Sequence, residues 1–126
     1  MNDSFDTETL QLLDRTREVR IETRRDADSS EHRTIIWVVV VEGGVYVRSV
    51  RGQKGRWYRE ISSNPEGALH AGGRRIPVRA VPATDEATVD AVSEAFRSKY
   101  ERSSPASTAA MLRPDVLPTT LKLSPA

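Results

Sequence analysis

Residues 35–50 read IIWVVVVEGGVYVRSV, and this stretch decides the fold. Its first seven residues are nearly all β-branched and do not alternate with polar residues, which is typical of a strand buried on both faces. Gly43-Gly44 predicts a two-residue hairpin link, because the favoured turns of this length need positive φ at their centre. Residues 45–50 then return as a second, antiparallel strand.

Further strands are predicted on both sides of this hairpin. Residues 19–25 alternate between apolar and charged side chains, which is typical of a half-buried strand. Residues 67–71 and 75–81 form a second predicted hairpin across Gly72-Gly73. Residues 119–124 alternate again and predict a last strand. The total is six strands.

Helical patterns separate these strands. Residues 1–17 predict an amphipathic N-terminal helix, with Ser4 or Asp6 as its cap. One or two helical turns follow Gly55 and end at Asn64-Pro65. Residues 84–100 predict the longest helix, capped by Thr84. The Ser/Pro-rich segment 101–118 is predicted to be largely loop, with at most a helical turn at 109–112.

The order of these elements defines the expected fold class. We predict one α+β domain over residues 1–126, dominated by an antiparallel sheet, with a long helix before the last strand. A short sheet with so few apolar positions buries them best when it closes on itself. A small β-barrel is therefore expected.

Composition limits the classes of function. The 126 residues carry a formal net charge of +1, so no global positive field favours nucleic acid. Cysteine is absent and the two histidines are far apart, which leaves no sequence motif for a metal site or a thiol nucleophile. No segment has the roughly 18 apolar residues of a membrane span, and the N-terminus lacks a signal-peptide pattern. A cytoplasmic protein with no membrane partner is expected.

The segment RSVRGQKGRWYR at residues 48–59 concentrates positive charge directly after the hydrophobic hairpin. In an anion-binding interpretation, four basic residues grip a phosphate, two glycines let the backbone approach it, and the following helix presents its N-terminus. In the alternative interpretation, the loop is simply charged and exposed, with Trp57 packed beneath it. Trp37 is expected to pack in the core.

The order of motifs from Arg33 to Val81 resembles the flavin and deazaflavin split-barrel proteins. That superfamily includes pyridoxamine-phosphate oxidase-like and deazaflavin-dependent nitroreductase-like proteins. The resemblance rests on Trp57-Tyr58 opening a helix, Asn64-Pro65 closing it, and Gly72-Gly73 in the next hairpin. More narrowly, the chain is similar to small bacterial split-barrel proteins of unknown function over roughly residues 5–126.

This resemblance implies an FMN or deazaflavin cofactor and a homodimer with cofactor sites at the subunit interface. Together with the basic loop, it gives nine candidate cofactor-binding residues: Arg33, Thr34, Arg48, Ser49, Arg51, Gly52, Lys54, Arg56 and Trp57. The catalytic residues stay unassigned, and no metal ligand is predicted. The chain departs from the nitroreductase-like pattern at Asp26, Asp28 and Glu31, where carboxylates would repel a cofactor phosphate.

Three functions follow from these observations. The first is a flavin- or deazaflavin-dependent oxidoreductase, in which the cofactor carries the chemistry. The second is a non-enzymatic protein that holds flavin, haem or another anionic ligand. The third, a barrel that binds single-stranded nucleic acid through Trp57 and Tyr58, is disfavoured by the low net charge.

Overall fold

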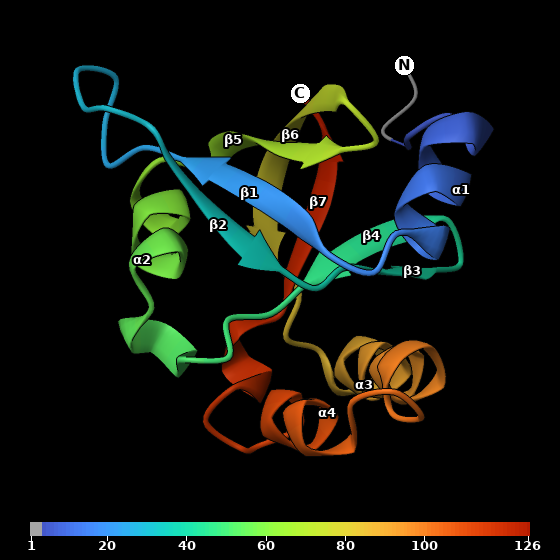
Figure 1. Ribbon diagram of the computed structural model, residues 1–126. Coiled ribbons are helices and arrows are strands. Elements are labelled where there is room, and N and C mark those ends of the chain that lie inside the picture. The colour runs from blue at the N-terminus through green and yellow to red at the C-terminus, as the bar shows by residue number, and fades with distance from the viewer. Residues whose placement is uncertain (1–3) are drawn as a thin grey trace.

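Seven antiparallel strands form one curled sheet in the computed structural model, which describes residues 4–126 (Figure 1). The order across the sheet is β2-β1-β5-β6-β7-β4-β3. The predicted antiparallel α+β class is confirmed. The strands are β1 (Val19–Thr23), β2 (His32–Ile36), β3 (Val39–Val41), β4 (Gly44–Val47), β5 (Glu66–Ala71), β6 (Arg74–Pro82) and β7 (Leu121–Pro125).

The two edge strands of the sheet, β2 and β3, are consecutive in the chain. Only Trp37 and Val38 separate them, so the chain crosses from one edge of the curled sheet to the other. The prediction of one continuous strand over residues 35–41 is therefore wrong, and this break accounts for the seventh strand. The prediction that this run is buried on both faces also fails at Ile35, which is 58% exposed.

The first hairpin turns one residue earlier than predicted. Val41 pairs with Gly44, so the turn consists of Glu42 and Gly43, with φ of +49° and +80°. Gly44 lies in the strand, where a Cβ atom would be only 2.8 Å from the Tyr46 ring. The second hairpin turns at residues 72–73, as predicted, with positive φ at both glycines.

Four helices flank the sheet (Figure 1). The Asp6 carboxylate caps the first helix by accepting a hydrogen bond from the Thr9 amide, and Asp85 rather than Thr84 caps the third. Residues 1–3, which were included in the predicted N-terminal helix, lie outside the described part of the chain. The helices are α1 (Thr7–Arg15), α2 (Arg56–Ser63), α3 (Glu86–Tyr100) and α4 (Pro105–Met111), with 3₁₀ turns at Gly52–Lys54 and Leu117–Thr119.

The segment 101–118, predicted as largely loop, contains α4 and the second 3₁₀ turn. Pro105 begins α4, at a position where its missing N–H costs nothing. The side chains of Thr108 and Met111, on the inner side of this helix, are buried. Its short apolar pattern was too weak to identify in the sequence. Among the described residues, no helix is long and apolar enough to cross a membrane.

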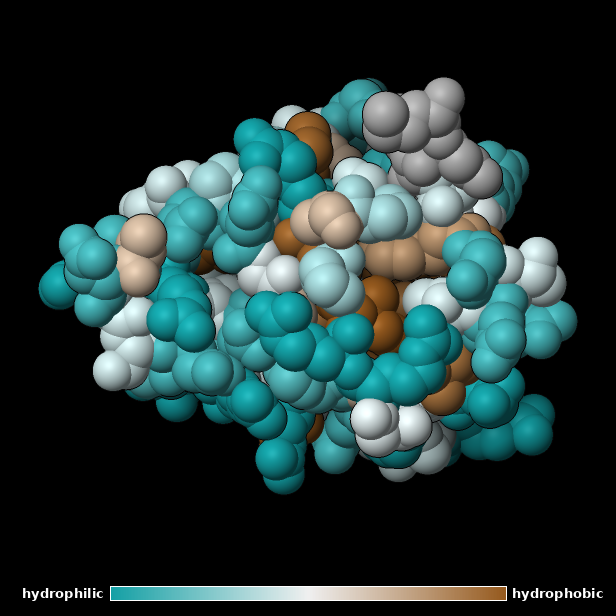
Figure 2. All heavy atoms as spheres, turned by 90° about the horizontal axis from the view of Figure 1, so that it is seen from above, coloured by the Kyte–Doolittle hydropathy of each residue, from teal (hydrophilic) through white to brown (hydrophobic). Residues whose placement is uncertain are grey.

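The interior of the curl holds the main core. Side chains from five strands are fully buried there, among them Ile21, Val45, Leu69, Val78 and Leu123. A second cluster joins β3 and β4 to the helices below them and consists of Val39, Tyr46, Val92, Phe96, Tyr100 and Met111. Seen from above, the surface is mainly hydrophilic, with apolar side chains visible at its centre (Figure 2).

Candidate functional site: a cleft beside the split in the sheet

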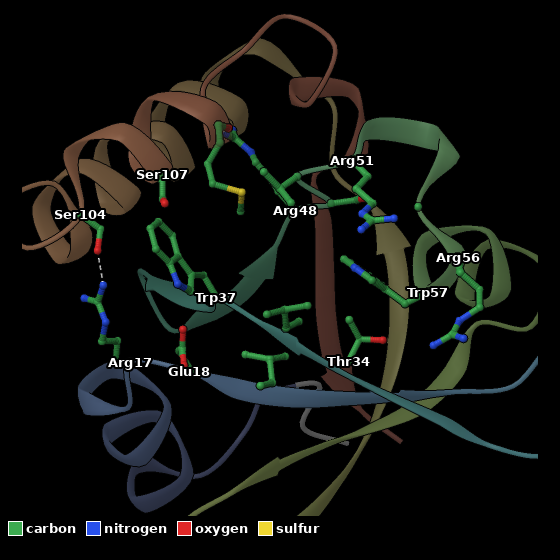
Figure 3. A pocket seen from close by; sticks show the side chains of 16 residues that line it. Arg17, Glu18, Thr34, Trp37, Arg48, Arg51, Arg56, Trp57, Ser104 and Ser107 are labelled. Carbon is green, nitrogen blue, oxygen red and sulfur yellow. Dashed lines mark hydrogen bonds between the residues drawn. The ribbon is translucent and has the colours of Figure 1, made fainter.

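A cleft of about 750 Å³ opens where the chain crosses between the two edges of the sheet (Figure 3). Its walls come from β2, the Trp37 crossing, the loop after β4, the start of α2, and α4. The volume lies within the range of roughly 300–1,000 Å³ that is typical of small-molecule sites. These segments are far apart in the sequence, and they come together only because the sheet curls.

One end of the cleft is positively charged. The exposed side chains of Arg51 and Arg56 line it, and neither forms a hydrogen bond or ion pair with another described residue. Helix α2 begins at the same place with Gly55 as its N-cap, and no side chain caps it. A helix N-terminus of this kind carries amide donors and a partial positive charge. This end of the cleft therefore combines two arginine side chains with the amide donors of the helix N-terminus.

The middle of the cleft is apolar and aromatic. Trp57, which is only 6% exposed, forms one wall together with Val50. Trp37 faces the cleft from the other side and stacks on Tyr100, with ring centroids 3.9 Å apart and planes 1° from parallel. Aromatic side chains therefore line the middle of the cleft on both sides.

Arg48, a predicted phosphate ligand, directs its guanidinium away from this positive end (Figure 3). The side chain is 1% exposed, and all its hydrogen bonds go to protein acceptors. Nε donates to Thr120 Oγ1 at 2.8 Å, Nη1 to Ser93 Oγ at 3.0 Å and to the Met111 carbonyl at 3.2 Å, and Nη2 to the Val89 carbonyl at 2.9 Å. Burial lowers the pKa of this guanidinium to about 10. Its donors serve the contact with α3 and α4.

The glycine loop also uses its own amides. Gly52 N donates to the Ser49 carbonyl at 2.9 Å, and Gly55 N to the Gly52 carbonyl at 3.3 Å. Ser49 Oγ donates to the Gly52 carbonyl at 2.8 Å. The expected approach of these two glycine amides to an anion is therefore not available in this conformation. Gly52 instead faces Asp115, to which a Cβ atom would approach within 3.2 Å.

The cleft brings together six of the nine predicted cofactor residues: Thr34, Arg48, Ser49, Arg51, Arg56 and Trp57. Arg33, Gly52 and Lys54 lie outside its lining. Arg33 is held by Glu31, at 2.9 Å from Nε to Oε2. Cofactor binding by these residues remains a prediction.

The acidic segment between β1 and β2 does not reach the cleft. Asp26 accepts hydrogen bonds from Ser29 Oγ and the Asp28 amide, which lower the pKa of its carboxyl. Glu31 pairs with Arg24 and Arg33. Of the described residues that line the cleft, Glu18 is the single carboxylate. The expected repulsion of a phosphate by this acidic segment therefore has no structural basis.

Residues that the sequence analysis did not select form the opposite end of the cleft: Arg17, Glu18, Ser104, Ser107 and Met111. Arg17 lies between α1 and β1, and the two serines lie around the start of α4. Arg17 donates hydrogen bonds to Ser103 and Ser104, which lie 86 and 87 residues further along the chain. No local motif connects them, so only the fold shows that they meet.

Neither histidine lines the cleft. His32 Nδ1 lies 3.1 Å from Glu60 Oε2, and His70 Nε2 lies 2.8 Å from Glu22 Oε1. Both rings contact buried carboxylates of the sheet and of α2. Residues 4–126 contain no group of three or more potential ligands placed to hold a metal ion.

A curled antiparallel sheet, with two edge strands that are consecutive in the chain and a cleft at the split between them, defines a split-barrel protein. The model of one bacterial family, described as "Uncharacterized protein conserved in bacteria (DUF2255)", matches residues 9–123. The chain belongs to that family. No curated protein matches the chain.

Solved structures confirm the fold. An F420-H2-dependent reductase is 17% identical with a TM-score of 0.64, covering 90% of this chain and 96% of that one. The haem-storage protein HutZ from Vibrio cholerae is 13% identical with a TM-score of 0.62, covering 98% and 91%. A candidate pyridoxamine 5'-phosphate oxidase from Listeria innocua is 13% identical with a TM-score of 0.61, covering 94% and 90%. At these identities, the likeness concerns the fold alone.

Proposed function

We propose that the cleft binds FMN or a deazaflavin coenzyme and that the protein is an oxidoreductase acting on a small molecule. One observation carries this proposal. Arg51 and Arg56, without a protein partner among the described residues, stand at the uncapped N-terminus of α2, directly beside the aromatic middle of the cleft. A phosphate tail and a planar ring need this combination of surfaces.

The residues present fit such a cofactor. Arg51 and Arg56 would hold the phosphate by charge-assisted hydrogen bonds, and Trp37 and Trp57 would flank the ring. When bound, the cofactor would supply the electron or hydride transfer. The chain itself would bind and orient the cofactor and exclude water with Val50 and Met111. The likeness to an F420-H2-dependent reductase supports this proposal.

Non-enzymatic binding of flavin or haem is the second candidate. The likeness to a haem-storage protein supports it. Met111 lines the cleft, and its thioether is of a type that ligates haem iron. The histidines, which are the commoner haem ligands, lie outside the cleft.

The visible spectrum of freshly purified protein, followed by titration with FMN, a deazaflavin coenzyme and haem, tests these candidates. Both tryptophans of the chain line the cleft, so flavin binding should quench intrinsic fluorescence. Bound flavin that a nicotinamide donor or another reductant reduces, with transfer to an acceptor, supports the oxidoreductase. Bound flavin or haem without turnover supports the second candidate. No binding of any of the three would refute both.

We also propose that the protein is a homodimer that covers the cleft. Ile35 and Val50 both line the cleft and are 58% and 45% exposed, so two of the three large exposed hydrophobic side chains of the described residues lie on this one face. A second copy placed over this face would bury them. Light scattering at micromolar concentration should give twice the mass of the chain, and a monomer would contradict the proposal.

A further inference from the structure

The end of the cleft opposite Arg51 and Arg56 holds another arginine, Arg17, and some of its N–H donors form no hydrogen bond. Arg17 Nη1 donates to Ser103 Oγ at 2.6 Å, and Nη2 donates to Ser104 Oγ. These bonds orient the guanidinium toward the α3–α4 connection (Figure 3). A guanidinium carries five N–H donors, so most of the donors of Arg17 are free.

The charge of Arg17 is held in place without being neutralised. It forms no ion pair with a carboxylate of the described residues. Its guanidinium carbon lies 5.7 Å from the Trp37 ring centroid and 5.5 Å from that of Tyr100. Because these two distances are nearly equal, the cation lies beside the stacked pair and leaves the outer face of Trp37 uncovered by it.

Arg48 shows how this fold uses a purely structural arginine. It is 1% exposed, and its three guanidinium nitrogens all donate to protein acceptors. Arg17 differs in both respects, because it is exposed and only two of its nitrogens donate. If Arg17 served only to connect the segment after α1 with the start of α4, its guanidinium would not need to be exposed in the cleft.

The surrounding groups select the type of anion. Ser107 lines the same end of the cleft as Arg17 and has no hydrogen bond to another described residue, so its hydroxyl can donate (Figure 3). Glu18 lies in the same wall, and its negative charge disfavours a doubly charged phosphate more than a singly charged carboxylate. The neighbouring face of Trp37 favours a planar group attached to that carboxylate.

We propose that Arg17, Ser104 and Ser107 form a subsite for the carboxylate of a small planar organic acid. This inference rests on the proposed function, because it assigns the far end of the same cleft to the substrate of the bound cofactor. The phosphate end and the carboxylate end lie on opposite sides of the aromatic middle (Figure 3). The two ligands would therefore meet over the tryptophans.

Benzoate and its neutral analogue benzamide test the subsite without a known substrate. Each is titrated into ¹⁵N-labelled protein while the indole N–H signals of the two tryptophans are followed. Wild-type protein should bind benzoate at least about tenfold more tightly than benzamide, which is the effect of one charge-assisted contact. Arg17→Gln should remove this preference and leave the affinity for benzamide within about twofold.

Two further variants make the result decisive. Ser107→Asp, at an exposed position, places a negative charge in the wall and should weaken benzoate binding without affecting benzamide. Arg102→Gln removes a neighbouring exposed cation outside the cleft and should change neither affinity. Equal binding of benzoate and benzamide by the wild type, or benzoate binding that Arg17→Gln and Ser107→Asp both leave intact, would overturn the subsite.

Titration of the same variants with FMN separates this inference from the proposed function. Arg17→Gln should bind FMN as the wild type does. FMN binding together with equal binding of benzoate and benzamide would refute the carboxylate subsite alone. A benzoate preference that depends on Arg17, in a protein that binds no flavin, would support the subsite and refute the cofactor assignment.

Discussion

Tyr100 stacks face to face on Trp37, with ring centroids 3.9 Å apart, at the point where the chain crosses from one edge of the sheet to the other. The Tyr100 hydroxyl accepts a hydrogen bond from the Val38 amide at 3.2 Å and donates to the Arg17 carbonyl at 2.7 Å. Lys99 Nζ donates to the Val38 carbonyl at 2.7 Å. Helix α3 thus satisfies the backbone groups that lose their strand partners at the split.

Tyr100→Phe tests this role, because it keeps the stacked ring and removes the hydroxyl. Burial raises the pKa of Tyr100 to about 12, so the hydroxyl is neutral at ordinary pH. Its loss leaves the buried Val38 amide unsatisfied and should lower the free energy of unfolding by about 1–3 kcal/mol in urea denaturation. Tyr58→Phe, whose hydroxyl has no hydrogen bond to another described residue, is the control and should change stability little. Equal stability of the two variants would contradict this account.

Arg48→Met should destabilise the fold rather than act on ligand binding alone. The change removes the donors that serve Thr120, Ser93 and two carbonyl groups in a buried position. Leaving a buried acceptor without its donor costs about 1–3 kcal/mol, and a shift of the urea midpoint would reveal a loss of this size. A variant as stable as the wild type but unable to bind flavin would instead restore the sequence-based assignment of Arg48 to the phosphate.

The sequence predicted the class of fold and most of the strands because hydrophobic periodicity and glycine turns are local signals. The break at Trp37 and Val38 could not be predicted, because it depends on how strongly the whole sheet curls, and this is not a local property of the sequence. The one-residue shift of the first hairpin has a similar cause. The Tyr46 ring leaves no room for a Cβ atom at position 44, so Gly44 lies in the strand, and Glu42 and Gly43 form the turn with positive φ.

Glu42→Gly should therefore stabilise the protein by about 0.5–1 kcal/mol. A side chain at φ +49° is strained, and glycine adopts this region freely. Gly44→Ala in the same hairpin should have the opposite effect, because its Cβ would lie 2.8 Å from the Tyr46 ring. Thermal or urea unfolding of the two variants provides the comparison. If both changes move stability in the same direction, the assignment of the turn residues fails.

Glu22 should make stability depend on pH under acid conditions. Hydrogen bonds from Arg75 and His70 lower the pKa of this buried carboxyl from 4.5 to about 2. Its stabilisation is therefore complete above pH 4.5 and is lost as the pH falls toward 2. The advantage of the wild type over Glu22→Gln should decrease across that interval by up to about 3 kcal/mol.

The surface pair of Glu66 and Arg79 provides the control for this pH dependence. The Glu66 side chain is 66% exposed, so Glu66→Gln should change stability little at any pH. Urea denaturation of all three proteins from about pH 6 down to about pH 2, the lower limit of this interval, measures the difference. An advantage over Glu22→Gln that stays constant with pH would contradict the assignment.

Only part of the candidate site could be predicted from the sequence. The cluster RSVRGQKGRWYR identified the positive end, since Arg51, Arg56 and Trp57 lie close together in the chain. It could not show that Arg48 turns toward α3, because the buried acceptors that hold its guanidinium come from distant segments. Arg17 was missed for the same reason.

The central claim is that Arg51 and Arg56 bind the phosphate of a flavin cofactor. An FMN titration of Arg51→Ala/Arg56→Ala, followed by tryptophan fluorescence, tests it most directly. The matched controls are Lys54→Ala and Arg59→Ala, which remove exposed cations outside the cleft lining. We predict that the double variant keeps its folded stability and loses at least about tenfold in FMN affinity, while both controls bind FMN as the wild type does. An FMN affinity equal in all four proteins would contradict the claim.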